Sequence, residues 1–456
     1  MNVLKPLFAA ICLSLLFNPL ALAQDSAEGD DTPFEASEDD GDGTEAEAIE
    51  CSERNPEACD RQEIIDWVEW ATQTSTDQVE RRLSIDALPG DPLFKSRTID
   101  KWMARKARIE KKHGVTFGTD YNSVYMRATE SPGEKTGFGG SLRFFGVWNV
   151  TEQEDGDGGA LIWKVEHRHA YGSNVSPQGV GAEIGYAGLV HLTISDQRTR
   201  LSNLYWRQRF AGGNWAFVGG WTDTGDYVDV YLLGSPWDSF MNYAFSTGSA
   251  SMPVPNEGLA MAVGGGLGNK WYMIAGFADS NSDPHRPGDA FETFFNDREY
   301  FKHIEFGWSE SRETRWLNNV HLTLWHADER EDAGVLDGWG ANFNFSRLYA
   351  DHWSTFVRLG YAKDGGSILS LSASVGAAWS KVPGGNQLGL GLNWGEVNET
   401  TYGEGLPDQT TVELYYRIQM WEELAITPDI QYIRNPALNP DASSTWVFGL
   451  RARLAF

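Results

Sequence analysis

The last twelve residues of the chain, TWVFGLRARLAF, alternate between apolar and cationic side chains. Trp446, Phe448 and Leu450 share one parity, whereas Arg451 and Arg453 share the other. Because successive side chains of a β-strand point to opposite faces, the segment predicts a strand with one oily face and one charged face. Soluble proteins seldom end on such an edge, since an exposed apolar strand invites aggregation. A strand of an outer-membrane β-barrel needs this pattern, because lipid covers one face and a polar lumen the other.

The same period of two recurs in sixteen segments from Gly114 to the end of the chain. These candidate strands lie near residues 114–128, 137–152, 159–171, 200–211, 214–222, 258–267, 270–281, 299–311, 315–327, 336–348, 352–363, 366–379, 385–396, 409–420, 423–433 and 445–456. The composition suits such a wall, because 49 Gly and 13% aromatic residues supply turns and interfacial girdles. We therefore predict an all-β transmembrane fold, a 16-stranded antiparallel β-barrel over residues 114–456.

The gaps between these candidate strands alternate in length. Short gaps such as 212–213 and 421–422 alternate with long gaps such as 172–199 and 223–257, although the short gap at 364–365 breaks the rule. A barrel with tight periplasmic turns and longer external loops requires this alternation. The even number of strands also places both ends of the barrel on the periplasmic side.

The N-terminus has the features of an export signal. Lys5 provides a positive charge, residues 7–17 are apolar, and Ala21 and Ala23 form a small-x-small cleavage pattern before Gln24. We expect residues 1–23 to be removed on export. No later stretch holds eighteen uninterrupted apolar residues, so a chain like this can cross a membrane only as a closed barrel.

Residues 24–60 are predicted to be a disordered acidic leader. Twelve acids and no base lie in residues 24–50, which accounts for nearly half of the net charge of −27. Cys51 and Cys59 are predicted to form a disulfide loop, because they lie close together in an exported chain. Metal binding by this pair is the weaker alternative. The absence of a basic surplus argues against a nucleic-acid partner.

Residues 61–113 are predicted to be a helical periplasmic segment. Ile64, Val68 and Ala71 have helical spacing, Pro89 breaks the chain, and a second, basic helix is expected from about residue 99 to 112. The segment is expected to form a cap packed on the inner rim of the barrel. The alternative is a module that binds a partner or faces the peptidoglycan.

Parity also assigns charged side chains to the lumen. A charge on the lipid face at mid-membrane costs about 2–4 kcal/mol, so the charged parity of each strand should point inward. The inward candidates for lining the pore or contacting substrate are Arg143, Arg168, Arg207, Arg209, Glu305, Arg358, Glu413, Arg417, Asp429 and Arg451. Arginine donors and carboxylate acceptors can bind hydroxyl groups. The alternative role is a structural ladder of salt bridges that braces the wall.

The long gap at 223–257 is predicted to fold into the barrel and narrow it. It mixes acids and aromatics that suit contact with sugars, namely Asp226, Tyr227, Asp229, Tyr231, Trp237, Asp238 and Tyr243. The alternative is an external loop that only caps the barrel. Binding in such a channel must stay weak, because a tightly held solute does not pass.

The C-terminal third resembles the carbohydrate-selective porins of the OprB type. The resemblance rests on TVELYYRIQMWEELAITPDIQYIRNPALNPD, on the final WVFGLRARLAF, and on the stretches RIEKKHGVTFGTDYNSVYMR and LSNLYWRQRF. It extends over roughly residues 100–456, and the acidic leader with Cys51 and Cys59 departs from it. The resemblance implies a sixteen-stranded barrel that passes sugars across the outer membrane.

The predicted function is passive, selective diffusion of carbohydrates through the outer membrane of a Gram-negative bacterium. No cofactor and no catalysis is required, and the sequence contains neither a Gly-x-Ser-x-Gly elbow nor a His-Glu-x-x-His motif. The predicted partners are the carbohydrate, outer-membrane lipid, the barrel-assembly machinery through the strand ending at Phe456, and a possible second copy of the chain. Three alternatives remain open: a porin for other solutes such as anions, an outer-membrane barrel enzyme, and a soluble secreted sugar-binding protein.

Overall fold

The computed structural model describes residues 78–456, apart from 89, 96–98, 153–155, 311–316 and 383. The predicted signal peptide, the acidic leader with Cys51 and Cys59, and the helical run expected from Arg61 lie outside these residues. No helix in the described part of the chain is long and apolar enough to traverse a bilayer.

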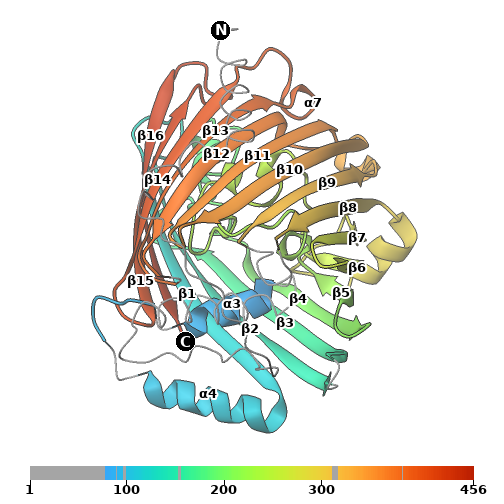
Figure 1. The fold of residues 1–456 in the computed structure, drawn as a ribbon. Helices are drawn as coiled ribbons and strands as arrows, with labels where there is room; N and C mark the ends of the chain where they lie inside the picture. Colours follow the sequence, from blue (N-terminus) through green and yellow to red (C-terminus); the bar gives the residue numbers. More distant parts are fainter. Residues whose placement is uncertain (1–77, 89, 96–98, 153–155, 311–316, 383) are drawn as a thin grey trace, which may run out of the picture. The chain divides into compact units, whose positions relative to one another are not determined.

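Sixteen antiparallel strands form a closed barrel in which β1 pairs with β16 and every other strand pairs with its sequence neighbours (Figure 1). The strands are β1 (Val115–Ala128), β2 (Thr136–Glu152), β3 (Gly158–Ala170), β4 (Arg198–Phe210), β5 (Trp215–Thr222), β6 (Gly258–Leu267), β7 (Trp271–Asp279), β8 (Tyr300–Ser309), β9 (Asn319–Ala327), β10 (Gly338–Tyr349), β11 (Trp353–Asp364), β12 (Leu369–Ser380), β13 (Gln387–Val397), β14 (Gln409–Gln419), β15 (Leu424–Arg434) and β16 (Ser444–Ala455). Closure pairs the backbone groups that an open sheet would leave exposed at its edges.

The structure confirms the predicted barrel of sixteen strands. The clearest difference is the connection from β8 to β9, where strand pairing stops at Ser309 and resumes at Asn319, so this turn is longer than predicted. The connection after β11 is also short, although it spans the four residues 365–368 instead of the two that the sequence indicated. We call the end of the barrel that carries the short connections the turn side, and the opposite end the loop side.

The strands sort their side chains by parity, as the alternation predicts. On β2, Phe144 and Trp148 point outward and are 47% and 44% exposed, whereas Arg143 and Phe145 point inward and are buried. On β16, Phe448 is exposed and Arg451 is buried. The outward wall is therefore apolar and aromatic, while the inward wall carries the charges.

The helices are short and few among the described residues. They are α3 (Gln78–Ala87), α4 (Asp100–His113), α5 (Val180–Glu183), α6 (Ala290–Glu292) and α7 (Glu399–Tyr402), with single turns η1 (Thr224–Asp226), η2 (Tyr243–Phe245), η3 (Thr247–Ala250), η4 (Thr293–Asp297) and η5 (Glu331–Ala333). The second predicted helix, expected near 99–112, corresponds to α4. Gly114 ends this helix with φ 66°, a left-handed conformation that glycine adopts without steric cost.

Helices α3 and α4 contact opposite faces of the barrel wall at the turn side. Val79 of α3 packs in a cluster with the inward side chains Phe145 and Ile162. Trp102 of α4 instead meets the outward ring of Phe117 edge-on, at 5.9 Å between centroids. The chain therefore runs from inside the barrel around its rim to the outer wall before it enters β1 (Figure 1).

Two long connections fold into the lumen. Residues 223–257 are almost entirely buried, which confirms the predicted infolded loop, and their aromatic core packs Tyr231, Phe240 and Phe245 against Phe356 and Tyr415 of the wall. Residues 171–197 contribute Val180, Ile184, Val190 and Ile194 to a second cluster against β1, β15 and β16. These contacts fix both segments inside a cylinder that the strands alone would leave wide.

Candidate functional site

The segment 223–257, which we call the inner loop, is fastened to the barrel by inward side chains from many strands. Glu413 of β14 accepts hydrogen bonds from the backbone N–H groups of Met241 at 2.5 Å and Asn242 at 3.0 Å. Gln431 of β15 accepts one from the Asn242 side chain at 3.0 Å. These acceptors satisfy loop N–H groups that would otherwise be buried without a partner.

Asp229 of the inner loop bonds both to the barrel wall and within the loop. Its carboxylate accepts a hydrogen bond from the Gly248 N–H at 2.6 Å, contacts His321 Nε2 at 2.9 Å, and pairs with Arg358 of β11. Its own N–H donates to Glu305 of β8 at 2.7 Å. Burial raises the pKa of the Asp229 carboxyl, but the Arg358 guanidinium, His321 and the Gly248 N–H together outweigh this effect and hold that pKa below its usual range.

Two arginines of the last strands hold backbone carbonyls. Arg451 of β16 donates to the Pro236 and Ser239 carbonyls of the inner loop at 2.8 and 3.1 Å. Arg417 of β14 donates twice to the Gly385 carbonyl, at 3.1 and 2.7 Å. Both guanidiniums therefore point inward from the wall and hold neighbouring loops by hydrogen bonds to backbone carbonyls.

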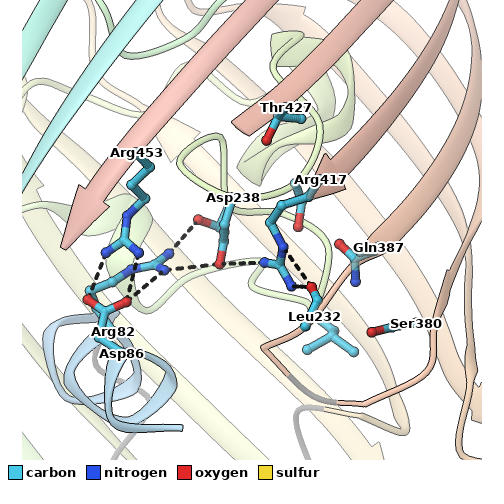
Figure 2. A network of polar contacts seen from close by, with 12 residues as sticks. Arg82, Asp86, Leu232, Asp238, Ser380, Gln387, Arg417, Thr427 and Arg453 are labelled. Carbon is cyan, nitrogen blue, oxygen red and sulfur yellow. Dashed lines mark hydrogen bonds and ion pairs between the residues drawn. The ribbon is translucent and has the colours of Figure 1, made fainter. Parts of the chain in front are cut away.

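Helix α3 joins the inner loop to the barrel wall through a chain of charges (Figure 2). Arg82 donates to Asp238 of the inner loop at 3.0 Å, and Arg417 lies 3.8 Å from the same carboxylate. Arg453 of β16 pairs with Asp86 of α3 at 2.7 Å. Burial raises the pKa of Asp238, but Arg82 and then Arg417 outweigh it and hold that pKa well below its usual range.

The opposite side of α3 is fastened in the same way. Glu80 pairs with Arg207 of β4 and lies 3.6 Å from Arg209. Arg81 donates to the Leu232 carbonyl of the inner loop at 2.8 Å. Helix α3 thus lies inside the lumen and bonds to both the wall and the inner loop.

A cavity of about 250 Å³ lies between the inner loop and the wall formed by β2, β3 and β4. The cavity is far larger than the ~10–15 Å³ that one water needs, so it is a passage or site and not a packing defect. The wall contributes cations and the inner loop contributes carboxylates and rings. The polar and aromatic lining includes Arg82, Arg143, Lys164, Arg168, Gln178, Arg200, Asp223, Asp226, Trp237, Tyr243, Asn256 and Glu257.

Each of the four wall cations of this cavity has a carboxylate partner. Arg143 donates to Asp120 at 2.7 Å, and Lys164 donates to Asp226 at 2.6 Å. Arg168 Nε donates to Glu166 at 2.7 Å. Arg200 pairs with Glu257 at the edge of the inner loop. The local charge is therefore close to balanced, although the wall is rich in donors.

Trp237 gives the cavity its aromatic surface. The Arg143 guanidinium lies 3.7 Å from the centroid of the Trp237 ring, and that of Arg168 lies 5.9 Å from it. Such cation–π contacts fix the ring against the wall. Donors, acceptors and an aromatic face thus meet within one hydrated space.

All ten residues predicted to face the lumen do so, but they lie in different surroundings. Arg143 and Arg168 line the cavity, Arg207 and Arg209 hold α3, and Glu305, Arg358, Glu413 and Arg451 bind the inner loop. Arg417 lies between Asp238 of the inner loop and Gly385, and Asp429 accepts from Gln431 at 3.0 Å. Nine of the ten are buried, and Arg209 is partly exposed.

The predicted inner-loop residues divide in the same way. Asp226, Trp237 and Tyr243 line the cavity, whereas Tyr231 and Asp229 are buried as packing and anchoring groups. Sequence reasoning did not select Lys164 and Arg200 as site residues, although Lys164 has the inward parity. No local sequence pattern marked Glu80 and Arg82 of helix α3 as lumen residues, because only the fold brings them there.

The arrangement gives a polar solute donors, acceptors and an aromatic face in one cavity. No group of His, Cys, Asp and Glu side chains within the described ranges is placed to hold a metal ion. The charged groups of the cavity bind one another, and a polar solute can exchange hydrogen bonds with them in turn.

Comparison with known proteins agrees with this geometry. Residues 317–456 match the family described as carbohydrate-selective porin, OprB family. The structure of Pseudomonas putida OprB at high pH superposes with a TM-score of 0.62 at 14% sequence identity, covering 78% of this chain and 97% of that chain. The same protein at low pH gives 0.49 at 13% identity, over 79% and 98% of the two chains. A triple mutant of the Rhodopseudomonas blastica porin gives 0.48 at 12% identity, over 75% and 100%.

No relative is found among curated proteins. The superposition on Pseudomonas putida OprB establishes the fold, and the family match covers about a third of the chain, from β9 to β16. The resemblance seen in the sequence is therefore confirmed for residues 317–456, which match the carbohydrate-selective porins of the OprB family, and the superposition extends the likeness in fold to 78% of the chain.

Proposed function

We propose that the protein is a passive channel that lets carbohydrates diffuse across the outer membrane of a Gram-negative bacterium. The observation that carries this proposal is the cavity of about 250 Å³ between the inner loop and strands β2–β4. Sugars present hydroxyl groups around an apolar ring face. The cavity offers donors from Arg143 and Arg168, acceptors from the inner loop, and the ring of Trp237.

Charge balance favours a neutral solute over an anion. An anion that entered the cavity would gain attraction from the wall cations but would meet the carboxylates that pair with them. Because Arg143, Lys164 and Arg168 already bind Asp120, Asp226 and Glu166, little net positive potential remains to hold an anion. A neutral sugar gains the hydrogen bonds without opposing charge.

The test is liposome swelling with monosaccharides and disaccharides, compared with swelling in amino acids of similar size. We expect faster swelling with sugars, and a reduced advantage for sugars in Arg143→Ala. The matched control is Arg286→Ala, because Arg286 is an exposed loop-side residue that pairs with Asp283 and Asp289 of its own loop and does not line the cavity. A channel that admits both solute classes equally, in the wild type, contradicts the proposal.

One observation favours an anion channel as second candidate. Arg417 and Arg451 donate mainly to carbonyl oxygens, so their charge is balanced less completely than that of the cavity wall. Reversal potentials in a salt gradient separate the two candidates. The carbohydrate channel should show weak ion selectivity, whereas strong anion selectivity without sugar uptake supports the alternative.

We propose three roles for the ten inward candidates. Arg143 and Arg168 contact the passing solute. Glu305, Arg358, Glu413, Asp429 and Arg451 hold the inner loop, directly or through Gln431, and so set the width of the passage. Arg207 and Arg209 position α3, and Arg417 positions Asp238, the inner-loop residue to which Arg82 of α3 also bonds. Alanine variants of the first group should change sugar block at constant conductance, whereas those of the second should change conductance.

Passive diffusion requires no catalysis, so we propose that the protein is not an enzyme. Turnover of a lipid ester or a peptide by the purified barrel contradicts this statement. The proposed location is the outer membrane, with the turn side in the periplasm. Recovery of the protein in a soluble fraction without detergent rules this location out.

The chain divides, in our proposal, into a signal peptide (1–23), an acidic leader with a Cys51–Cys59 disulfide (24–60), a helical periplasmic segment (61–113) and the porin barrel (114–456). We further propose that the barrel-assembly machinery recognises the last strand through Phe456, and that copies of the barrel can associate. Phe456→Ala should lower the folded yield in cells, and cross-linking in native membranes reports the oligomeric state.

A further inference from the structure

Helix α4 combines an apolar contact with the barrel and a basic face that points away from it. Trp102, Met103, Lys106 and Ile109 are partly covered, and Trp102 and Lys106 both approach Phe117, the latter with its ammonium 5.7 Å from the ring centroid. The exposed positions carry Lys101, Arg105, Arg108, Lys111 and Lys112. This is the pattern of a helix that lies along an interface.

The cations of α4 are available for a partner. Within the part of the chain that the structure describes, the five exposed Lys and Arg side chains of α4 form no ion pair. Arg108 donates only to the Ala104 carbonyl of its own helix, at 3.2 Å. Five cations on one exposed face of fourteen residues therefore present an uncompensated positive surface.

The position of α4 indicates what covers that surface. Phe117 lies on the outward parity of β1 and contacts Phe144 of β2, at 6.2 Å between ring centroids. Phe144 and the nearby Trp148 are exposed on the apolar outer wall, at the turn side. The helix thus begins where the lipid-facing belt ends, which is the depth of the phospholipid head groups.

We propose that α4 binds anionic phospholipid head groups of the periplasmic leaflet and anchors the rim of the barrel there. The proposal rests on the outer-membrane location given above, because that location supplies the leaflet. Charge complementarity and continuity with the lipid-facing wall both favour this occupant. The acidic leader of the same chain, which carries twelve acids in residues 24–50, is the competing occupant.

The experiment measures lipid retention by the full-length mature protein in detergent, using native mass spectrometry. Phosphatidylglycerol and phosphatidylcholine with the same acyl chains serve as anionic and neutral probes. The test variant replaces Lys101, Arg105, Lys111 and Lys112 with glutamine. The control variant replaces the same number of exposed cations elsewhere, at Lys135, Arg286, Arg298 and Lys363.

The wild type should retain phosphatidylglycerol in preference to phosphatidylcholine. Each Lys or Arg beside an anionic surface contributes about fivefold, so the α4 variant should lose at least tenfold of this preference. The control variant should keep it. A variant with Lys101, Lys111 and Lys112 changed to arginine should also keep it, which separates charge from any effect on folding.

Three outcomes overturn the proposal. The first is an α4 glutamine variant that retains phosphatidylglycerol as the wild type does, and the second is a control variant that loses as much of the preference as the α4 variant. Alternatively, phosphatidylglycerol binds only after residues 24–50 are deleted, which identifies the leader as the occupant of α4. Sugar-dependent liposome swelling is measured on the same samples. If sugars cause no swelling but lipid retention still depends on α4, the channel proposal is refuted and the lipid site stands.

Discussion

Replacement of Asp229 by asparagine tests whether the inner loop determines conductance and selectivity. The Asp229 carboxylate bonds to the Gly248 N–H, to His321 and to Arg358, and both side chains of the Asp229–Arg358 pair are fully buried. Asp229 has a φ of 53°, in the left-handed region that Asn tolerates as well as Asp. The substitution therefore removes the negative charge and preserves the backbone.

The cost follows from the charge that is left behind. Loss of one partner of a buried ion pair costs about 3–5 kcal/mol of stability. The asparagine amide oxygen can still accept hydrogen bonds, so we expect a cost near the lower end, ~3 kcal/mol. At about 1.4 kcal/mol per factor of ten, the ratio of displaced to seated inner loop rises roughly a hundredfold. The strand pairing of the barrel does not involve this side chain, so the cost falls on the loop.

Single-channel recordings in planar bilayers measure the effect. Asp229→Asn should show higher conductance, more current noise and weaker block by sugars than the wild type. The matched control is Asp283→Asn, because Asp283 pairs with Arg286 in an exposed loop where such a pair contributes less than about 1 kcal/mol. If Asp229→Asn conducts and discriminates like the wild type, the inner loop does not form the constriction.

Three further predictions concern the cavity, α3 and acid. Trp237→Ala should raise the sugar concentration that half-blocks the current several-fold, because it removes the ring beside Arg143. Glu80→Gln should increase conductance, because it removes the carboxylate that pairs with Arg207 and holds α3 in the lumen. Because the pKa of Asp238 is lower in the folded protein than in the unfolded chain, its ionised carboxylate stabilises the fold fully above the unfolded pKa of about 3.9. This stabilisation is lost only as pH falls through the lower folded pKa. The contribution of Asp238 should therefore stay constant between pH 8 and pH 5, so the conductance of the wild type relative to that of Asp238→Asn should not change in this window. A change of that ratio contradicts the assignment.

The sequence determined the barrel because alternation is a local property. Whether a side chain such as Phe448 or Arg451 faces lipid or lumen depends on its parity along one strand. A charged side chain on the lipid face costs free energy in every strand, so the same rule applies to all of them. The alternation of short and long gaps then indicated which neighbouring strands are joined by tight turns and which by long loops. The strand positions and faces were therefore predicted within a few residues, apart from the longer turn between β8 and β9.

The tertiary structure alone decided what the inward charges do. Parity could not separate Arg143, which stacks on Trp237 in the cavity, from Arg358, which is buried against Asp229. Their partners lie about a hundred residues away in the chain, and α3 reaches Arg207 and Arg453 from outside the barrel sequence. Pairing over such distances depends on the height of each residue along the pore and on how the loops fold inward. A period of two fixes the face of a strand, and only the closed barrel brings distant charges to the same level.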